Sequence, residues 1–266
     1  MSDDLAAFLD RPLAPADPAA LAAIDAGPMD PAHALPRTDL DRLLDPSPLP
    51  GETGWCTLPD GVSYVAVRTP MPGVTAAMVD WWFDWHPRDP LRYRVWHPRA
   101  HRSNRVEQPA TVGAKAHWGT VHHPVEDVGT GVVHARISFC APTALGFTTD
   151  ALDDPRVGTI ACGLVGDDRL HVRHSVMAHV WLNDGDGLVL RSRFWLGAVL
   201  RPDLPGPLGA AGARLINRPF VRRRALPSGL PRQLARHCAE EYANLGALLP
   251  ELYPRFGPAN VPRDRA

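Results

Sequence analysis

His237 and Glu241 stand four positions apart near the C-terminal end of the 266-residue chain, in a segment with a helical pattern of apolar residues. At this spacing both side chains project from one face of a helix, about a turn apart. Their neighbours Cys238 and Tyr242 belong to the apolar stripe, and a carboxylate facing a core is costly unless it is paired or bound to a metal ion. The pair therefore indicates a metal site, with a surface pair of histidine and glutamate as the alternative.

Two segments interrupted by proline offer further ligands for such a metal. His97 and His101 belong to the segment 93–101, and Glu126 follows in the segment 122–127. Imidazole and carboxylate groups suit zinc or another divalent first-row metal. Two histidines and two carboxylates from three separated segments would make a four-ligand set, and whether the segments meet depends on the fold.

Aromatic residues are concentrated in the same part of the chain. Seven of the eight tryptophans fall between positions 81 and 195, in the same stretches as several of the twelve histidines. Large rings interleaved with imidazoles favour a pocket with apolar walls and polar groups. A tryptophan-rich core is the alternative, since such rings are commonly buried for packing alone.

The bulk properties narrow the class of protein. The formal net charge of -1 gives no basic surface for a nucleic acid, and no apolar run is long enough to span a membrane. The N-terminus lacks the charged and apolar regions of a signal peptide, so a cytoplasmic protein is expected. The four cysteines are scattered, which favours neither a disulfide scaffold nor a thiolate zinc site.

The chain divides into a proline-rich N-terminal segment and a region of strands. Up to about position 50 the sequence predicts short helices at 4–9 and 18–26 but no strand. Beyond it we expect a helix at 74–85 and strands at 61–71, 110–121, 131–140, 159–165, 170–182 and 187–200. The Asn-Asp-Gly-Asp-Gly run at 183–187 predicts a tight hairpin between the last two strands.

A long amphipathic helix is expected at 231–249, with Ser228 as its N-cap and Pro231 in its first turn. Consecutive strands joined by short turns form an antiparallel sheet. Together these elements predict an α+β fold in which a curved antiparallel sheet surrounds the C-terminal helix. Such an arrangement leaves a cavity between sheet and helix, which is a natural ligand site.

Four blocks of the sequence are shared with a known family. They are Asp-Trp-Trp-Phe-Asp-Trp-His at 80–86, Arg-Tyr-Arg-Val-Trp-His-Pro-Arg-Ala-His at 92–101, Arg-Ser-Arg-Phe-Trp-Leu-Gly at 191–197 and His-Cys-Ala-Glu-Glu-Tyr-Ala-Asn-Leu at 237–245. In this order they resemble the signature blocks of the diacetylphloroglucinol hydrolase family, which also includes phloretin hydrolase. The resemblance extends from about position 55 to 253, and its specificity lies in the four blocks together.

The resemblance implies a Bet v 1-like helix grip at 55–255, with an N-terminal extension at 1–54 used in the contacts of a homodimer and a tail at 256–266. It also implies one zinc ion per subunit, held by His101, Glu126, His237 and Glu241. His101 is chosen over His97 because the family's ligand closes this block, and Asp127 is the alternative to Glu126.

The same resemblance assigns residues to the binding of a phenolic substrate. Its hydroxyl groups would be held by Tyr93, Asn104 and His179. The alternatives are that Tyr93 packs on a tryptophan, that Asn104 caps a turn and that His179 is a hydrogen-bonded histidine of the sheet. We expect apolar contacts from Trp96, Phe194 and Trp195. Phe194 stands where the family has tyrosine, which removes one hydroxyl from the pocket and points to a substrate lacking one ring hydroxyl.

The activity implied is zinc-dependent hydrolysis of the carbon–carbon bond between an acyl group and a polyhydroxylated ring of the acylphloroglucinol type, giving a phenol and a carboxylic acid. Zinc would polarise the acyl oxygen and activate water, while the ring leaves from its keto tautomer and His179 shuttles the proton. Two other classes stay open: a non-enzymatic carrier of hydrophobic ligands, and a metal-dependent polyketide cyclase or acyltransferase. A protein that interacts through its proline-rich N-terminus is a third.

Overall fold

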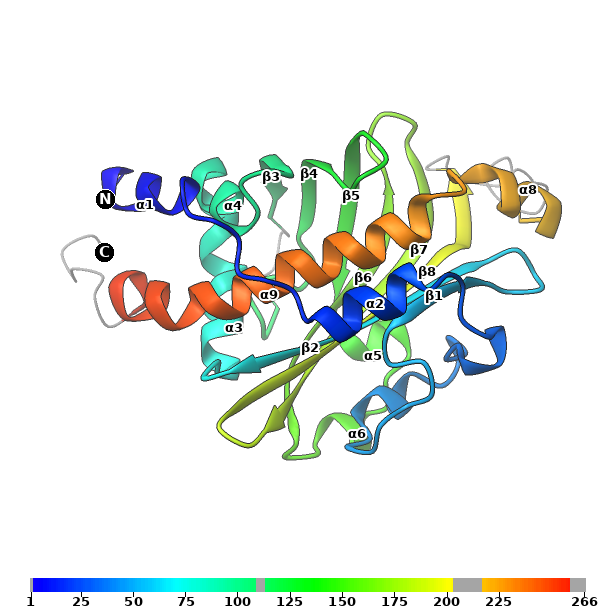
Figure 1. Cartoon of the computed structure of the whole chain (residues 1–266), viewed down its shortest axis with the longest axis horizontal. Coiled ribbons are helices and arrows are strands. Elements are labelled where there is room, and N and C mark those ends of the chain that lie inside the picture. The colour runs from blue at the N-terminus through cyan, green and yellow to red at the C-terminus, as the bar shows by residue number, and fades with distance from the viewer. Residues whose placement is uncertain (1, 109–112, 203–216, 259–266) are drawn as a thin grey trace.

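The computed structural model describes residues 2–108, 113–202 and 217–258, and within them eight strands form one antiparallel sheet (Figure 1). The strands are β1 (Gly54–Thr57), β2 (Ser63–Pro72), β3 (His101–Glu107), β4 (Val121–Asp127), β5 (Val132–Cys140), β6 (Val157–Asp167), β7 (Val172–Asp184) and β8 (Gly187–Pro202). Their order in the sheet is β1-β2-β8-β7-β6-β5-β4-β3. The sheet curves around the long helix α9 (Leu230–Phe256), which crosses it in Figure 1. The α+β helix grip expected from the sequence is thereby confirmed.

Strands β3 to β8 follow one another in the chain and pair with their sequence neighbours. The predicted hairpin between β7 and β8 is confirmed, since Asp184 pairs with Gly187 and Gly185 has a φ of 60°. Glycine adopts this positive φ without strain, which explains its place in the turn. Strand β2 pairs along its whole length with β8, which is distant in sequence, and so joins the N-terminal strands to the rest of the sheet.

The strand expected at 110–121 is wrong. Positions 109–112 lie outside the described residues, 113–120 form bends and turns, and the strands β3 and β4 lie on either side. β3 is the last strand of the sheet and carries mostly polar side chains, so it lacks the apolar alternation of a typical half-buried strand. β4 contains Pro124, a residue that argues against a strand in a sequence, and Glu126 lies near the end of this strand.

The C-terminal helix α9 begins near the expected position but extends further than expected at its C-terminal end. Pro231 occupies its first turn as predicted, whereas Ser228 is not its cap: Gly229 holds that position, without a side-chain hydrogen bond. The helix continues past position 249 to Phe256, where Leu252 is fully buried and Phe256 packs against the core. Among the described residues, no helix combines the length and apolar character needed to cross a membrane.

The N-terminal segment contains α1 (Ser2–Leu9), α2 (Pro18–Asp25) and the short 3-10 helices η1 (Pro31–His33) and η2 (Leu40–Leu44). Both predicted helices are confirmed, and no strand precedes β1 in the described part of the chain. Figure 1 shows α2 lying along α9, where Asp25 pairs with Arg232 at 2.8 Å and Arg236 at 3.1 Å. Helix α2 therefore packs on the outer side of α9.

The remaining helices connect strands. Between β2 and β3 lie α3 (Ala76–Trp85), η3 (His86–Arg88) and α4 (Pro90–Trp96). All three contribute side chains to the wall of the cavity described below. The short helices α5 (Pro142–Leu145) and α6 (Thr149–Leu152) join β5 to β6, and α8 (Pro219–Ala225) precedes α9.

Two hydrophobic clusters cover the two faces of the sheet. Along β8, Leu190 and Phe194 belong to the cluster under α9, whereas Val189 and Trp195 belong to the cluster under the N-terminal segment. This division follows from the alternation of side chains along a strand. The first cluster surrounds the cavity described below, and the second fixes the N-terminal segment to the back of the sheet.

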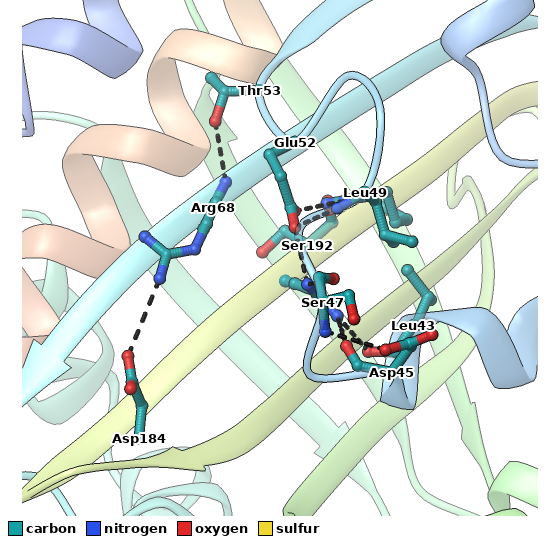
Figure 2. A network of polar contacts seen from close by, with 11 residues as sticks. Leu43, Asp45, Ser47, Leu49, Glu52, Thr53, Arg68, Asp184 and Ser192 are labelled. Atoms are coloured by element: carbon teal, nitrogen blue, oxygen red, sulfur yellow. Dashed lines mark hydrogen bonds and ion pairs between the residues drawn. The ribbon is translucent and has the colours of Figure 1, made fainter.

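Buried arginines fasten that segment to β8. Arg191 and Arg193 are 3% and 1% exposed, and both reach the carboxylate of Glu52. Figure 2 shows Glu52 in the loop before β1. Glu52 accepts hydrogen bonds from Arg191 at 2.7 Å, from Arg193 at 2.9 Å and from the backbone N–H of Leu49 at 3.0 Å. Arg191 also donates to the backbone carbonyls of Leu43, Asp45 and Ser47.

Candidate functional site

A cavity of about 410 Å³ lies between the sheet and α9. Its wall is formed by residues of α3, α4, the strands β3 to β8 and α9, and most of it is apolar. The volume is typical of a small-molecule site. The helix grip therefore encloses the kind of space that the sequence predicts.

Four side chains with metal-ligating atoms meet at one end of this cavity. His101 opens β3 and is the register partner of Glu126 on β4, so the two lie side by side at the edge of the sheet. His237 and Glu241 face them from successive turns of α9. Nε2 of His101 is 3.4 Å from a carboxylate oxygen of each glutamate. Nε2 of His237 is 3.6 Å from Glu241 and 4.0 Å from Glu126.

The two alternative ligands lie outside this group. Nδ1 of His97 accepts a hydrogen bond from a backbone N–H, and its Nε2 is 3.9 Å from Glu240. The carboxylate of Asp127 accepts from two glycine N–H groups in the turn after β4. The structure thus brings His101 and Glu126, rather than these residues, to the side chains of α9.

Burial sets the charge state of the four groups. It raises the pKa of Glu241 well above its usual value and also raises the pKa of Glu126. It lowers the pKa of His101 and, together with the charges of His101 and His97, lowers the pKa of His237 well below its usual value. The imidazoles are therefore neutral, and each keeps a nitrogen lone pair for a metal ion. The carboxylates are buried away from water, so a bound cation would supply the stabilisation of their charge that solvent does not.

These features fit a bound metal ion. Nδ1 of His101 bonds to the backbone oxygen of Tyr93 at 3.1 Å, whereas its buried Nε2 has no hydrogen-bond partner. The first contact fixes the ring and directs the lone pair of Nε2 toward the carboxylates. One ligand atom each from His101, His237 and Glu241 lie within 4.8 Å of one another. This buried group could hold a metal through nitrogen and oxygen ligands.

Tyr93 supports this group from α4. Its ring stacks on the imidazole of His101, with centroids 4.1 Å apart, and its hydroxyl donates to Glu126 at 2.5 Å. Burial, followed by the charge of Glu126, raises the pKa of Tyr93 well above its usual value, so the hydroxyl keeps its proton. Tyr93 also borders the cavity, but its hydroxyl faces Glu126.

Asn104 borders the deeper part of the cavity together with a histidine that the sequence analysis did not assign. The side-chain amide nitrogen of Asn104 lies 3.2 Å from Nδ1 of His122, and its Oδ1 is buried without a hydrogen-bond partner. His122, Pro124 and Glu126 alternate along β4 and all three line the cavity. Recognising β4 as a strand would therefore have placed His122 in the site.

His179 lies on β7 among aromatic rings of the cavity wall. Its Nδ1 is 2.8 Å from the hydroxyl of its register partner Ser192, and its ring is 5.3 Å from Phe194 and 4.9 Å from Tyr242, centroid to centroid. Burial lowers the pKa of His179 to about 3, so the imidazole is neutral. Ser192 and Tyr242 were not predicted as site residues; the place of Tyr242 beside Glu241 in the apolar stripe was a local signal for it, whereas nothing local marks Ser192.

The three predicted apolar contacts are divided between the two faces of the sheet. Trp96 and Phe194 line the cavity, and the indole N–H of Trp96 donates to the backbone oxygen of Glu241 at 3.0 Å. Trp195 packs in the cluster on the opposite face and donates to the backbone oxygen of Leu35 at 2.9 Å. The prediction for Trp195 is wrong because adjacent residues of a strand point to opposite faces.

The fold and the buried group define the class of this chain: a Bet v 1-like helix-grip protein with a candidate metal centre at one end of an apolar cavity. The profile of the DAPG hydrolase PhiG domain matches residues 35–254. The chain therefore belongs to the diacetylphloroglucinol hydrolase family, and the resemblance carried by the four sequence blocks is confirmed.

Two curated relatives match most of the chain. A 2,4-diacetylphloroglucinol hydrolase from Pseudomonas protegens is 33% identical over 226 residues, which cover 82% of this chain and 73% of that protein. A phloretin hydrolase from Eubacterium ramulus is 29% identical over 259 residues, which cover 92% of this chain and 88% of that protein. Among solved structures, protein CV1439 from Chromobacterium violaceum aligns with a TM-score of 0.39 and 12% identity, covering 73% of this chain and 99% of that one.

Proposed function

We propose that this protein hydrolyses the carbon–carbon bond between an acyl group and a polyhydroxylated aromatic ring, and releases a phenol and a carboxylic acid. The observation that carries the proposal is the buried group of histidines and glutamates at the end of an apolar cavity. The relatives suggest the substrate class, because they are named as hydrolases of diacetylphloroglucinol and of phloretin. Both names describe ketones on a hydroxylated ring.

The metal in this proposal is zinc, one ion per subunit, held by His101, Glu126, His237 and Glu241. Neutral imidazole nitrogens and carboxylate oxygens are ligands that zinc takes in hydrolases. When bound, zinc supplies a Lewis acid for the acyl oxygen and lowers the pKa of a water molecule toward neutrality. The hydrogen bond from Tyr93 would orient the carboxylate of Glu126, as outer partners of metal ligands commonly do.

The aromatic ring must be activated, because an aryl carbanion is a poor leaving group. A polyhydroxylated ring can adopt a keto form that carries a proton on the acyl-bearing carbon, and cleavage then releases an enolate. Asn104 is suited to bind a ring hydroxyl, since its buried Oδ1 has no other partner. His122 holds the other end of this amide and would keep the oxygen directed at the ring.

His179 is the residue that we assign to proton transfer at the ring. The contact between its Nδ1 and Ser192 leaves Nε2 for exchange with the substrate. Because its pKa is lowered to about 3, the imidazole accepts a proton only transiently, from a ring hydroxyl that is losing it, and returns it to the acyl-bearing carbon.

Metal content and product release of one variant test the proposal. His237→Ala should lose both stoichiometric zinc and chelator-sensitive release of a carboxylic acid from diacetylphloroglucinol or phloretin, measured by mass spectrometry. His33→Ala, a change at an exposed histidine, is the matched control and should keep both. Full hydrolysis by His237→Ala would contradict the assignment of the metal centre.

The same experiment separates the alternatives. A hydrophobic ligand carrier has no evident need for the two buried carboxylates of Glu126 and Glu241, and would release no acid from either ketone. A cyclase or acyltransferase would give a larger or rearranged product. Dimer formation through residues 1–54 also remains a proposal, which the mass of the protein in solution would test.

A further inference from the structure

One region of the cavity wall contains none of the residues to which a role in the reaction is assigned above. This region lies toward the N-terminal end of α9 and consists of Val172, Leu200, Leu226, Leu230 and Leu234. These five residues are called the apolar arm. Ser175 also borders the cavity, but its hydroxyl is already 2.6 Å from Nδ1 of His174. The five side chains of the arm itself are apolar, while polar residues of the cavity wall, among them His134 and Asp167, lie beside it on β5 and β6.

Two independent measures give the arm its length. Glu241 and Leu230 both line the cavity and lie eleven residues apart on α9, which corresponds to about 16 Å along the helix. On the sheet, Glu126 lies on β4 and Val172 on β7, three strand spacings or about 14 Å away. Both walls thus continue well beyond the candidate metal centre.

The volume of the cavity exceeds what a ring with a small acyl group requires. A cavity of roughly 150 Å³ is enough to hold a benzene ring. Of the 410 Å³ here, about 260 Å³ therefore remains for the rest of the ligand. That remainder is larger than the space of the ring itself.

We propose that the substrate carries a straight alkanoyl chain much longer than acetyl, lodged in the apolar arm; this inference rests on the proposed hydrolase function. The hydroxylated ring belongs beside Asn104, His122 and His179, which line the cavity and offer hydrogen bonds. With the carbonyl at the candidate metal centre, the apolar arm continues the ligand site toward Leu230. The acid released is then a medium-chain fatty acid.

The test compares kcat/KM for acetyl-, butanoyl-, hexanoyl- and octanoylphloroglucinol with the zinc-loaded protein. Burial of each added methylene should raise kcat/KM about fourfold, so that butanoyl exceeds acetyl by about fifteenfold. Binding of hexylresorcinol and methylresorcinol, which have no bond to cleave, gives a second measurement that does not depend on turnover. The hexyl compound should bind at least tenfold more tightly.

A variant that fills the arm localises the effect. Leu230→Trp should lower the ratio of octanoyl to acetyl hydrolysis at least tenfold, whereas Ser228→Trp adds the same ring at an exposed position and should keep the wild-type ratio. Hydrolysis of acetylphloroglucinol without a gain from longer chains, and equal binding of the two resorcinols, would overturn the alkanoyl assignment and leave the proposed function standing. Hydrolysis of no ketone, with tight binding of hexylresorcinol, would overturn the proposed function instead.

Discussion

Replacement of Glu52 by glutamine should destabilise the protein far more than its position in a surface loop suggests. The carboxylate of Glu52 is the anionic partner of Arg191 and Arg193, two guanidinium groups that are almost completely buried on β8. Glutamine keeps the size of the side chain and one acceptor oxygen but removes the charge. Two buried cations would then share a neutral partner.

The structure sets the size of the effect. Removal of one partner of a fully buried ion pair costs about 3–5 kcal/mol. The Glu52 side chain is 17% exposed, and an amide oxygen still accepts a hydrogen bond, so we expect a loss of about 2 kcal/mol in the free energy of unfolding. For a chain of this size, that loss lowers the unfolding temperature by about 4–8 °C.

The effect should also depend on pH in a defined direction. Burial acts to raise the pKa of Glu52, but the hydrogen bond from Leu49 and the charges of Arg193 and Arg191 outweigh it, so the pKa is lowered from its ordinary value. A lowered carboxyl pKa contributes stability above the unfolded-state pKa, which is lost as the pH falls through the folded-state pKa. The difference between wild type and Glu52→Gln should be full at pH 7 and vanish in acid.

Urea denaturation at a series of pH values measures this difference, with Asp184→Asn as the matched control. Asp184 pairs with Arg68 in the same region at 3.8 Å, but both side chains are exposed and the pair contributes about 0–1 kcal/mol. Equal midpoints for the two variants at pH 7 would refute the reasoning, because they would mean that burial of the arginines adds nothing to the pair.

Two further predictions concern the cavity. Tyr93→Phe removes the hydroxyl that bonds to Glu126, so zinc affinity in a chelator competition should fall about 10–100-fold while KM changes little. A large rise in KM with unchanged zinc affinity would instead favour direct contact with the substrate. Phe194→Tyr adds a hydroxyl beside His179, and one new hydrogen bond should raise the preference for a trihydroxylated over a dihydroxylated aryl ketone about tenfold. An unchanged ratio of kcat/KM values would mean that the ring lies elsewhere.

Local patterns in the sequence predict those elements whose structure is decided locally. Local patterns predict both the apolar stripe of α9 and the glycine-containing turn after Asp184, and both are confirmed. Strand β3 is not legible, because an edge strand with polar side chains has no apolar alternation. Strand β4 is not predicted either, because a proline argues against a strand in a sequence, and the position of β4 depends on pairing with its neighbouring strands.

The candidate site shows the same limit. The spacing of His237 and Glu241 can be read within one helix, whereas the meeting of His101 with Glu126 depends on the register between β3 and β4. Sequence spacing contains no register, so these two residues could be assigned only through the family resemblance. The partnership of Glu52 with Arg191 spans 139 positions, and no local pattern marks it.

The order of the elements along the chain determines when the metal-binding group can exist during synthesis. His101 and Glu126 belong to a meander of neighbouring strands, a topology of mostly local contacts that can form early. His237 and Glu241 reach the ribosome exit only with α9, after all eight strands. A nascent chain that lacks α9 therefore presents only two of the four candidate ligands, and a metal ion has no complete site to occupy. A metal ion held by all four side chains would therefore stabilise only chains in which α9 has docked on the sheet.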